Sequence, residues 1–276
     1  MDRDPAAHVL SELGFAVSRR GDELHGSARI RPEMLVPGTS VLRMSILATW
    51  VDMLAGLLAV GVIQPRVPVT LHLDVDLHEP PANLAEVHAV ARLVKAGAGS
   101  VVSTVDLRDE TGRSFGSGTG LFVVARDPAL VIPGDLDDLV AVMAEPRGPL
   151  TVPFAERTGC EQVSPGTFAI DFSPERSNAS GTLNGGLLAL LAEEASLADR
   201  PGATLASMTL RYLRSVRVGP AIATAQVVGD LAEVEITDGG RDEVLAVLAT
   251  TRCFRGGAAL AAPAAAAVGD AGAIGC

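Results

Sequence analysis

Two apolar segments of the chain each carry carboxylates at positions where a buried helix would place them inside a core. Residues 40–56 read SVLRMSILATWVDMLAG, with Asp52 as the single acid, and residues 181–197 read GTLNGGLLALLAEEASL, with Glu193 and Glu194. A buried carboxylate is costly unless it has a partner or a chemical role. Both segments are therefore candidate sites, and helical periodicity alone does not choose between Glu193 and Glu194.

The residues that begin the second segment could bind an oxygen atom. Asn184 is a favourable N-cap, and Gly185 and Gly186 follow it without side chains that would cover the backbone. Exposed N–H groups at a helix N-terminus form a positive end that can hold a carbonyl oxygen or an oxyanion. A carboxylate and such a helix end together could catalyse attack on a carbonyl group.

The elements that must position these groups occur twice. Two strand-like runs precede each helix and four follow it, with turn residues between them. The runs of the first half span residues 15–18, 24–30, 69–77, 85–95, 100–109 and 113–125, and those of the second half span residues 159–163, 167–172, 204–213, 221–228, 231–237 and 244–254. A period of about 140 residues predicts a duplicated domain rather than a solenoid.

Composition sets the limits of the duplicated units. Residues 1–125 and 152–255 hold the two units, and residues 126–151, which contain four prolines and an acidic cluster, form the predicted linker. A short helix that bridges the halves is predicted at residues 136–144. Residues 256–276 contain mostly Ala, Gly and Pro, so this tail is predicted to be disordered.

Charge and hydropathy exclude several classes of protein. The chain has 276 residues, a formal net charge of −11 and 48% hydrophobic residues, which suits two soluble cores and argues against a nucleic-acid partner. The apolar run at residues 53–63 is too short to cross a bilayer, and the N-terminus lacks the features of a secretion signal. We therefore predict a cytoplasmic protein with no membrane partner and with reduced cysteines.

Other patterns resemble chemical motifs but fit structural roles better. Residues 112–116 match G-x-S-x-G but lie where a turn leads into a strand, so a hairpin is expected rather than a nucleophile elbow. His72, Asp74, Asp76 and His78 alternate along one strand face, where ligands two residues apart do not converge on one ion. We therefore predict neither a metal site nor a bound cofactor.

The motifs around the second helix resemble a known family. Residues 178–193, NASGTLNGGLLALLAE, are similar to the N-x-x-G-x-x-H-G-G…D/E signature of hotdog-fold acyl-CoA thioesterases of the phenylacetate-pathway type, and LRYLR at residues 210–214 is similar to their next strand. The resemblance covers nearly the whole chain as two hotdogs in tandem. It implies an α+β fold in which each antiparallel sheet wraps around a central helix and the two domains form an intrachain pseudo-dimer.

The resemblance assigns roles in thioester hydrolysis to five residues. Asn178 matches the polar residue before the helix, and Gly185 and Gly186 match the paired glycines. Glu193 and Asp52 match the helix carboxylate of the two halves. The glycine N–H groups would stabilise the oxyanion, and the carboxylate would act either as the general base for water or as the nucleophile. Asn178 would position the thioester or the water.

Two departures from the signature separate the halves. Asn184 stands where the signature has histidine, and residues 43–45, RMS, replace the histidine and both glycines in the first half. The family builds each site across two hotdogs. A site that pairs Asp52 with the Gly185 end of the second helix retains more of the signature residues than a site that pairs Glu193 with residues 43–45. We therefore expect the Asp52 site to be the active one.

Composition and resemblance together predict the substrate. Seven Phe, one Trp and one Tyr favour an aliphatic acyl chain, and Arg211, Arg214 and Arg217 are the local basic residues for the CoA part of an acyl-CoA. Two other functions are alternatives. A catalytically silent hotdog for acyl-ligand binding or assembly is favoured by the lost histidine. A hotdog dehydratase or hydratase needs a histidine near the acid, and none of the five histidines lies in either helix region. Homo-oligomers of the double hotdog are also consistent with the sequence.

Overall fold

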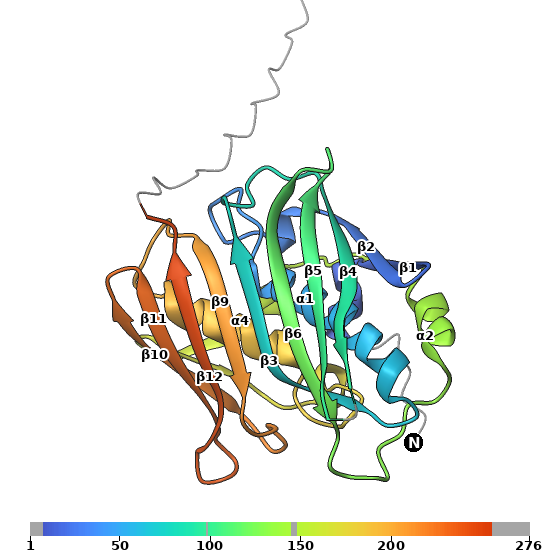
Figure 1. Cartoon of the computed structure of the whole chain (residues 1–276). Helices are drawn as coiled ribbons and strands as arrows, with labels where there is room; N and C mark the ends of the chain where they lie inside the picture. The colour runs from blue at the N-terminus through green and yellow to red at the C-terminus, as the bar shows by residue number, and fades with distance from the viewer. Residues whose placement is uncertain (1–7, 98, 145–147, 256–276) are drawn as a thin grey trace, which may run out of the picture.

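The strands of the computed structural model form one continuous sheet, on one face of which the two long helices lie (Figure 1). The structure describes residues 8–97, 99–144 and 148–255. Within these ranges the sheet has twelve strands in the order β1-β2-β4-β5-β6-β3-β9-β12-β11-β10-β8-β7, and every neighbouring pair is antiparallel. The tail at residues 256–276, predicted to be disordered, lies outside the described residues.

Each half of the chain supplies six of the strands. The first half contains β1 (Ala16–Arg20), β2 (Glu23–Arg29), β3 (Pro68–Leu77), β4 (Glu86–Ala96), β5 (Val101–Asp109) and β6 (Ser114–Val124). The second half contains β7 (Glu161–Ser164), β8 (Thr167–Ile170), β9 (Leu205–Tyr212), β10 (Ala221–Val228), β11 (Leu231–Asp238) and β12 (Val244–Cys253). All the strands predicted from the sequence are confirmed. The order of one half repeats in reverse in the other, and the halves meet where β3 pairs with β9.

The two central helices are α1 (Met44–Ile63) and α4 (Gly185–Leu197), which pack against each other. Asn184 caps α4, because its Oδ1 accepts a hydrogen bond from Gly186 N–H at 2.8 Å. Arg43 precedes α1 without a side-chain capping bond, and α1 begins and ends later than the predicted segment 40–56. The remaining helices are η2 (Val9–Leu13), η3 (Pro32–Met34), α2 (Leu136–Met143), α3 (Phe154–Arg157) and η4 (Pro174–Arg176).

The apolar character of α1 is explained by its burial. The helix is longer than the apolar run at residues 53–63, and by length and composition it could cross a bilayer. However, 67% of its most apolar window is buried inside the fold. Glycines on β6 let the helix come close to the sheet: a Cβ atom on Gly118 would collide with Val51, and one on Gly120 would lie 3.1 Å from Ala55. The alternating glycines of β6 therefore allow close packing of the helix on the sheet.

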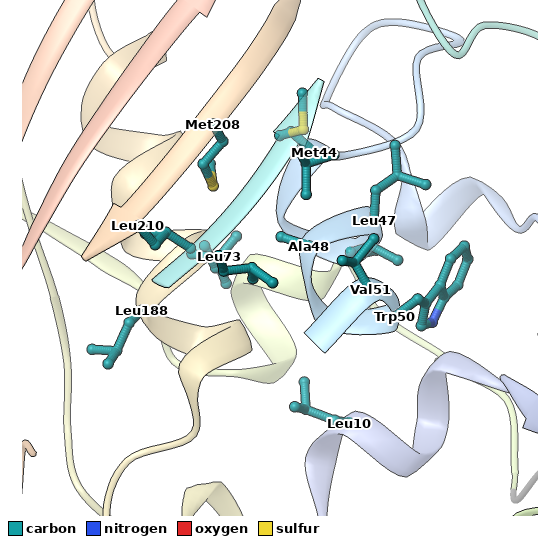
Figure 2. Close-up of a cluster of buried hydrophobic side chains, with 14 of the residues drawn as sticks. Leu10, Met44, Leu47, Ala48, Trp50, Val51, Leu73, Leu188, Met208 and Leu210 are labelled. Carbon is teal, nitrogen blue, oxygen red and sulfur yellow. The ribbon is translucent and has the colours of Figure 1, made fainter. Parts of the chain in front are cut away.

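The core continues across the junction between the halves. Figure 2 shows side chains of α1, among them Met44 and Ala48, beside Leu73 of β3, Leu188 of α4 and Leu210 of β9, and all five belong to one buried cluster. Burial of this shared apolar surface holds the two halves together. Polar side chains at the junction of the two halves are therefore held by a packed apolar core.

The predicted linker, residues 126–151, contains the predicted helix as α2. It packs mainly on β1 and α1, both in the first half, and Arg19 of β1 pairs with Asp137 of α2 at 2.9 Å. The helix thus covers the first half instead of bridging the two as expected. An ion pair between Glu12 of the first half and Arg157 of the second, at 2.6 Å, does join the halves.

Candidate active site

Asp52 lies in the middle of α1 and faces the beginning of α4. Its Oδ1 accepts a hydrogen bond from Thr70 Oγ1 of β3 at 2.9 Å, next to a bulge between Thr70 and His72. A Cβ atom placed on Gly185 would lie 3.5 Å from Asp52 Oδ2. The structure therefore brings the carboxylate of one half to the glycine end of the other, the pair that the sequence indicated.

The environment of Asp52 favours proton exchange near neutral pH. Burial raises the pKa of Asp52 to about 6, and the hydrogen bond from Thr70 opposes this rise by stabilising the charged form. A carboxylate with this pKa is ionised at neutral pH and can still accept a proton effectively. Thr70 also fixes one oxygen, so that the other oxygen faces Gly185.

The two glycines of α4 have different roles. Gly186 N–H already donates to Asn184 Oδ1, and a Cβ atom on Gly186 would collide with Thr49 of α1. Gly185 N–H has no protein acceptor among the described residues. Of the two glycines expected to offer an oxyanion donor, Gly186 uses its N–H group in the asparagine cap, so the role stays a prediction that fits Gly185 better. Gly186 instead lets α1 and α4 approach, and Gly185 is the candidate donor.

Tyr212 is a third polar group at this position, and the sequence analysis did not assign it to the site. Its hydroxyl donates to Gly185 O at 3.3 Å and would lie 3.1 Å from a Cβ atom on Gly185. Burial and, to a lesser extent, the charge of Asp52 raise the pKa of Tyr212 well above its usual value, so the phenol stays protonated. Its position in the strand, two residues after buried Leu210, was a signal that it points inward.

Asn178 organises the loop that precedes α4. Its Oδ1 accepts hydrogen bonds from the backbone N–H and hydroxyl of Ser180, at 3.0 and 2.7 Å, and from those of Thr182, both at 3.2 Å. The side-chain oxygen is therefore fully used in holding this loop. The role in positioning thioester or water, for which the amide nitrogen of Asn178 would be needed, stays a prediction.

Glu193 faces the beginning of α1, in the same way that Asp52 faces α4, but this second arrangement is closed. Its carboxylate accepts hydrogen bonds from Met44 N–H at 2.7 Å, from Ser45 N–H at 3.4 Å and from the Ser45 hydroxyl at 2.5 Å. The carboxylate itself thus takes the donors that would otherwise bind a carbonyl oxygen. Glu193 therefore caps α1, and a catalytic role for it stays a prediction.

Arg43 completes this closed arrangement. Its Nη1 lies 3.5 Å from Glu193 Oε2 and 2.6 Å from Glu194 Oε1, and both Arg43 and Glu193 are 1% exposed. Burial raises the pKa of Glu193, while the charge of Arg43 and the donors of Ser45 and Met44 oppose the rise. The arginine that replaces the family histidine is therefore the counter-ion of a structural carboxylate.

The three arginines predicted to bind CoA lie at two different places. Arg211 is exposed on β9, opposite His72 in the register of β3 with β9. Because side chains alternate along a strand and the next residue, Tyr212, faces inward, the Arg211 side chain lies on the outer face of the sheet. Arg214 and Arg217 are exposed in the loop after β9. Within this loop, Arg214 Nη1 donates a hydrogen bond to Leu245 O of β12 at 3.3 Å.

The loop with Arg214 and Arg217 is held beside the N-terminus of α4. Buried Asp238 accepts hydrogen bonds from Arg217 N–H at 2.9 Å and from Gly219 N–H at 2.7 Å. Leu183 N–H donates to Val216 O at 3.0 Å. The backbone of this loop is therefore fixed to Leu183, which lies two residues before Gly185 in the chain.

Two surface hollows lie away from this site. The larger, about 690 Å³, lies between α2, the end of α1 and strands β1 and β4, and the smaller, about 360 Å³, lies beside β2 and residues 148–149. Neither is lined by Asp52 or Gly185. Among the described residues no group of three His, Cys, Asp or Glu side chains could hold a metal ion, and His72 and Asp74 pair with each other at 2.7 Å.

Comparisons with known proteins agree with this architecture. The thioesterase superfamily model matches residues 45–115. An acyl-ACP thioesterase from Bacteroides thetaiotaomicron has a TM-score of 0.59 at 13% identity, covering 84% of this chain and 98% of that one. The 12:0-ACP thioesterase from Umbellularia californica has a TM-score of 0.61 at 15% identity, covering 86% and 99%. A search of curated proteins found no match. The chain therefore has the hotdog fold of these thioesterases, and its residues 45–115 match the thioesterase superfamily.

Proposed function

We propose that the protein hydrolyses acyl thioesters and consists of two hotdog units in tandem, residues 1–125 and 152–255, that pack as an intrachain pseudo-dimer. The mirrored strand order about β3 and β9 supports the duplication. So does the reciprocal arrangement in which Asp52 of α1 faces α4 and Glu193 of α4 faces α1. Thioester hydrolysis in general is supported by the superfamily match and by the thioesterase fold.

The observation that carries the proposal is the difference between these two arrangements. Asp52 Oδ2 lies beside Gly185, 3.5 Å from the position of a Cβ atom there, and the N–H of Gly185 has no acceptor among the described residues. Glu193, in contrast, occupies the N–H groups at the start of α1. One chain therefore contains one working site, made from the acid of the first half and the helix end of the second.

The chemistry of this site follows from its groups. Ionised Asp52 takes a proton from water, and the water oxygen attacks the acyl carbon. The carbonyl oxygen becomes negative and is stabilised by Gly185 N–H and the positive end of α4. When the intermediate collapses, the carbon–sulfur bond breaks, the thiolate receives the proton from Asp52, and the free acid and thiol leave.

The substrate that we propose is an aliphatic acyl-CoA. Leu, Ala and Val dominate the core around both helices, which suits an alkyl chain. The fixed loop with Arg214 and Arg217 offers cations to the phosphates of CoA. The two named structural relatives are acyl-ACP thioesterases, and an acyl carrier protein presents the same thioester. The test is release of free thiol from a series of acyl-CoAs and acyl carrier proteins. Absence of release from every member would overturn the proposal.

A mutation of the arginine loop should affect substrate binding more than the chemical step. We expect Arg214→Ala together with Arg217→Ala to raise KM for acyl-CoA roughly tenfold at low salt, because charge-assisted bonds to phosphate are lost. The effect should shrink at high salt as these charges are screened. Arg211→Ala is the matched control, since that side chain lies on the outer face of β9, and it should leave KM unchanged. If Arg211→Ala raised KM as much as the double substitution of Arg214 and Arg217, CoA would not bind at this loop.

The pH profile should report the ionisation of Asp52. Because only the charged carboxylate accepts a proton, we expect kcat/KM to rise with pH below about 6 and to level off above it. Thr70→Val removes a hydrogen bond that favours the charged form, so the midpoint should move to higher pH. Thr70→Ser, which keeps the hydroxyl, should restore it. A profile that Thr70→Val leaves unmoved would contradict the assignment of the midpoint to Asp52.

A catalytically silent hotdog that binds acyl ligands is the second candidate. Asn184 favours it, because this residue stands where the signature histidine is usual. This function predicts binding of acyl-CoA without release of thiol. The same thiol assay, combined with calorimetric titration of the acyl-CoA, separates the two functions.

A further inference from the structure

Tyr212 stands where a second donor to the reacting carbonyl would be needed. Its hydroxyl and Asp52 Oδ2 both border the space in front of Gly185, at 3.1 and 3.5 Å from the position of a Cβ atom there. The hydroxyl and the carboxylate come from different halves, Tyr212 on β9 and Asp52 on α1. The two groups therefore flank one small position at the junction of the halves.

The need for a second donor arises from the asparagine cap. Oxyanion sites act through preorganised donors aimed at the developing charge. Here Asn184 Oδ1 occupies Gly186 N–H, which leaves Gly185 N–H as the one free backbone donor of the two glycines. Asn184 also stands in place of the family histidine. A single N–H group is a weak site for a full negative charge.

The Tyr212 hydroxyl can meet this need without breaking a strong contact. Its bond to Gly185 O is 3.3 Å long, beyond the usual range for hydroxyl donors, and is therefore weak. Burial and the neighbouring Asp52 keep the phenol protonated, so that it remains a donor. A small rotation of the hydroxyl hydrogen would direct it from Gly185 O toward an oxygen in front of Gly185.

We propose that Tyr212 is a catalytic residue that donates the second hydrogen bond to the oxyanion of the thioester intermediate. This inference rests on the proposed hydrolase function. When water adds to the acyl carbon, the carbonyl oxygen accepts hydrogen bonds from Gly185 N–H and from the Tyr212 hydroxyl. Tyr212 keeps its proton throughout, and the proton of the water travels through Asp52 to the leaving thiolate. No other reactant is required.

The test is the Tyr212→Phe variant, which removes only the hydroxyl. We expect kcat to fall roughly 100-fold, in the range for loss of one oxyanion donor, with KM and the melting temperature nearly unchanged. Thr209→Val is the matched control, because its hydroxyl lies on the same strand but donates to Asp74 at 2.7 Å on the outer face. This control should keep full activity. A kcat within twofold of the unmodified protein for Tyr212→Phe, or a rise in KM alone, would overturn the inference.

A second measurement excludes a merely structural role. Tyr212 is the only tyrosine in the chain, so growth on fluorotyrosine alters this residue alone. Fluorination makes the phenol more acidic and a stronger donor, and we expect kcat to change with ring acidity while folding stays the same. A kcat independent of fluorination would overturn the inference and leave the hydrolase function standing. Absence of thiol release from the unmodified protein would overturn both.

Discussion

Asp52→Asn is expected to lower kcat for thioester hydrolysis by about 10²- to 10⁴-fold, the contribution of a general base. The amide that replaces the carboxylate cannot take a proton from water. Its oxygen can still accept the hydrogen bond that Thr70 donates to Asp52 Oδ1 at 2.9 Å, so the local structure should remain. Free-thiol release with the best acyl-CoA of the substrate series measures this effect.

The stability of this variant gives a control with a definite sign. Because the pKa of Asp52 is raised in the folded protein, the folded state binds a proton more tightly than the unfolded state does. The carboxylate therefore stabilises the fold least at pH values above about 6, where it is charged in both states. Asp52→Asn should be at least as stable as the unmodified protein at neutral pH. Loss of activity together with unfolding would contradict a purely chemical role.

The largest expected loss of stability follows from Arg43→Met. This change leaves the carboxylate of Glu193 buried without its counter-ion, and breaking a buried pair by removing one partner costs about 3–5 kcal/mol. Arg43 Nη1 also contacts Glu194 at 2.6 Å, so two acids lose their cation at once. The free energy of unfolding in urea measures the loss.

Two further variants show whether the buried charge is the cause. Arg43→Met combined with Glu193→Gln removes both members of the pair and should recover part of the stability. Arg19→Met breaks the exposed pair with Asp137 and should have little effect, since exposed pairs contribute little. If Arg43→Met were no more destabilising than Arg19→Met, Glu193 would not depend on this arginine.

The general architecture could be predicted because the local signals agree with one another. Alternating apolar residues, turn residues and the duplicated order identified each strand, and Asn184 followed by two glycines marked the start of α4. Only the family resemblance predicted that Asp52 lies opposite Gly185. Distances between residues far apart in sequence depend on how the halves pack, and no local pattern contains them.

The details that could not be predicted involve competition for hydrogen bonds. A sequence shows that Gly186 has an accessible N–H group, but not that the Asn184 side chain binds it. In the same way, residues 43–45 looked degraded as a carbonyl site, yet they form a closed network with Glu193. Tyr212 was missed because its partner Gly185 lies on another element, far from it in the sequence.

The most direct test of one working site per chain compares the two carboxylates that face the two helix ends. Thiol release is measured for Asp52→Asn and for Glu193→Gln, both checked for native circular dichroism. Glu193→Gln should retain most of the activity, because Glu193 serves as a cap for α1 at Met44 and Ser45. Asp52→Asn should fall near the background rate. Retained activity in Asp52→Asn with loss in folded Glu193→Gln would show that the working site lies at the other end of the pseudo-dimer.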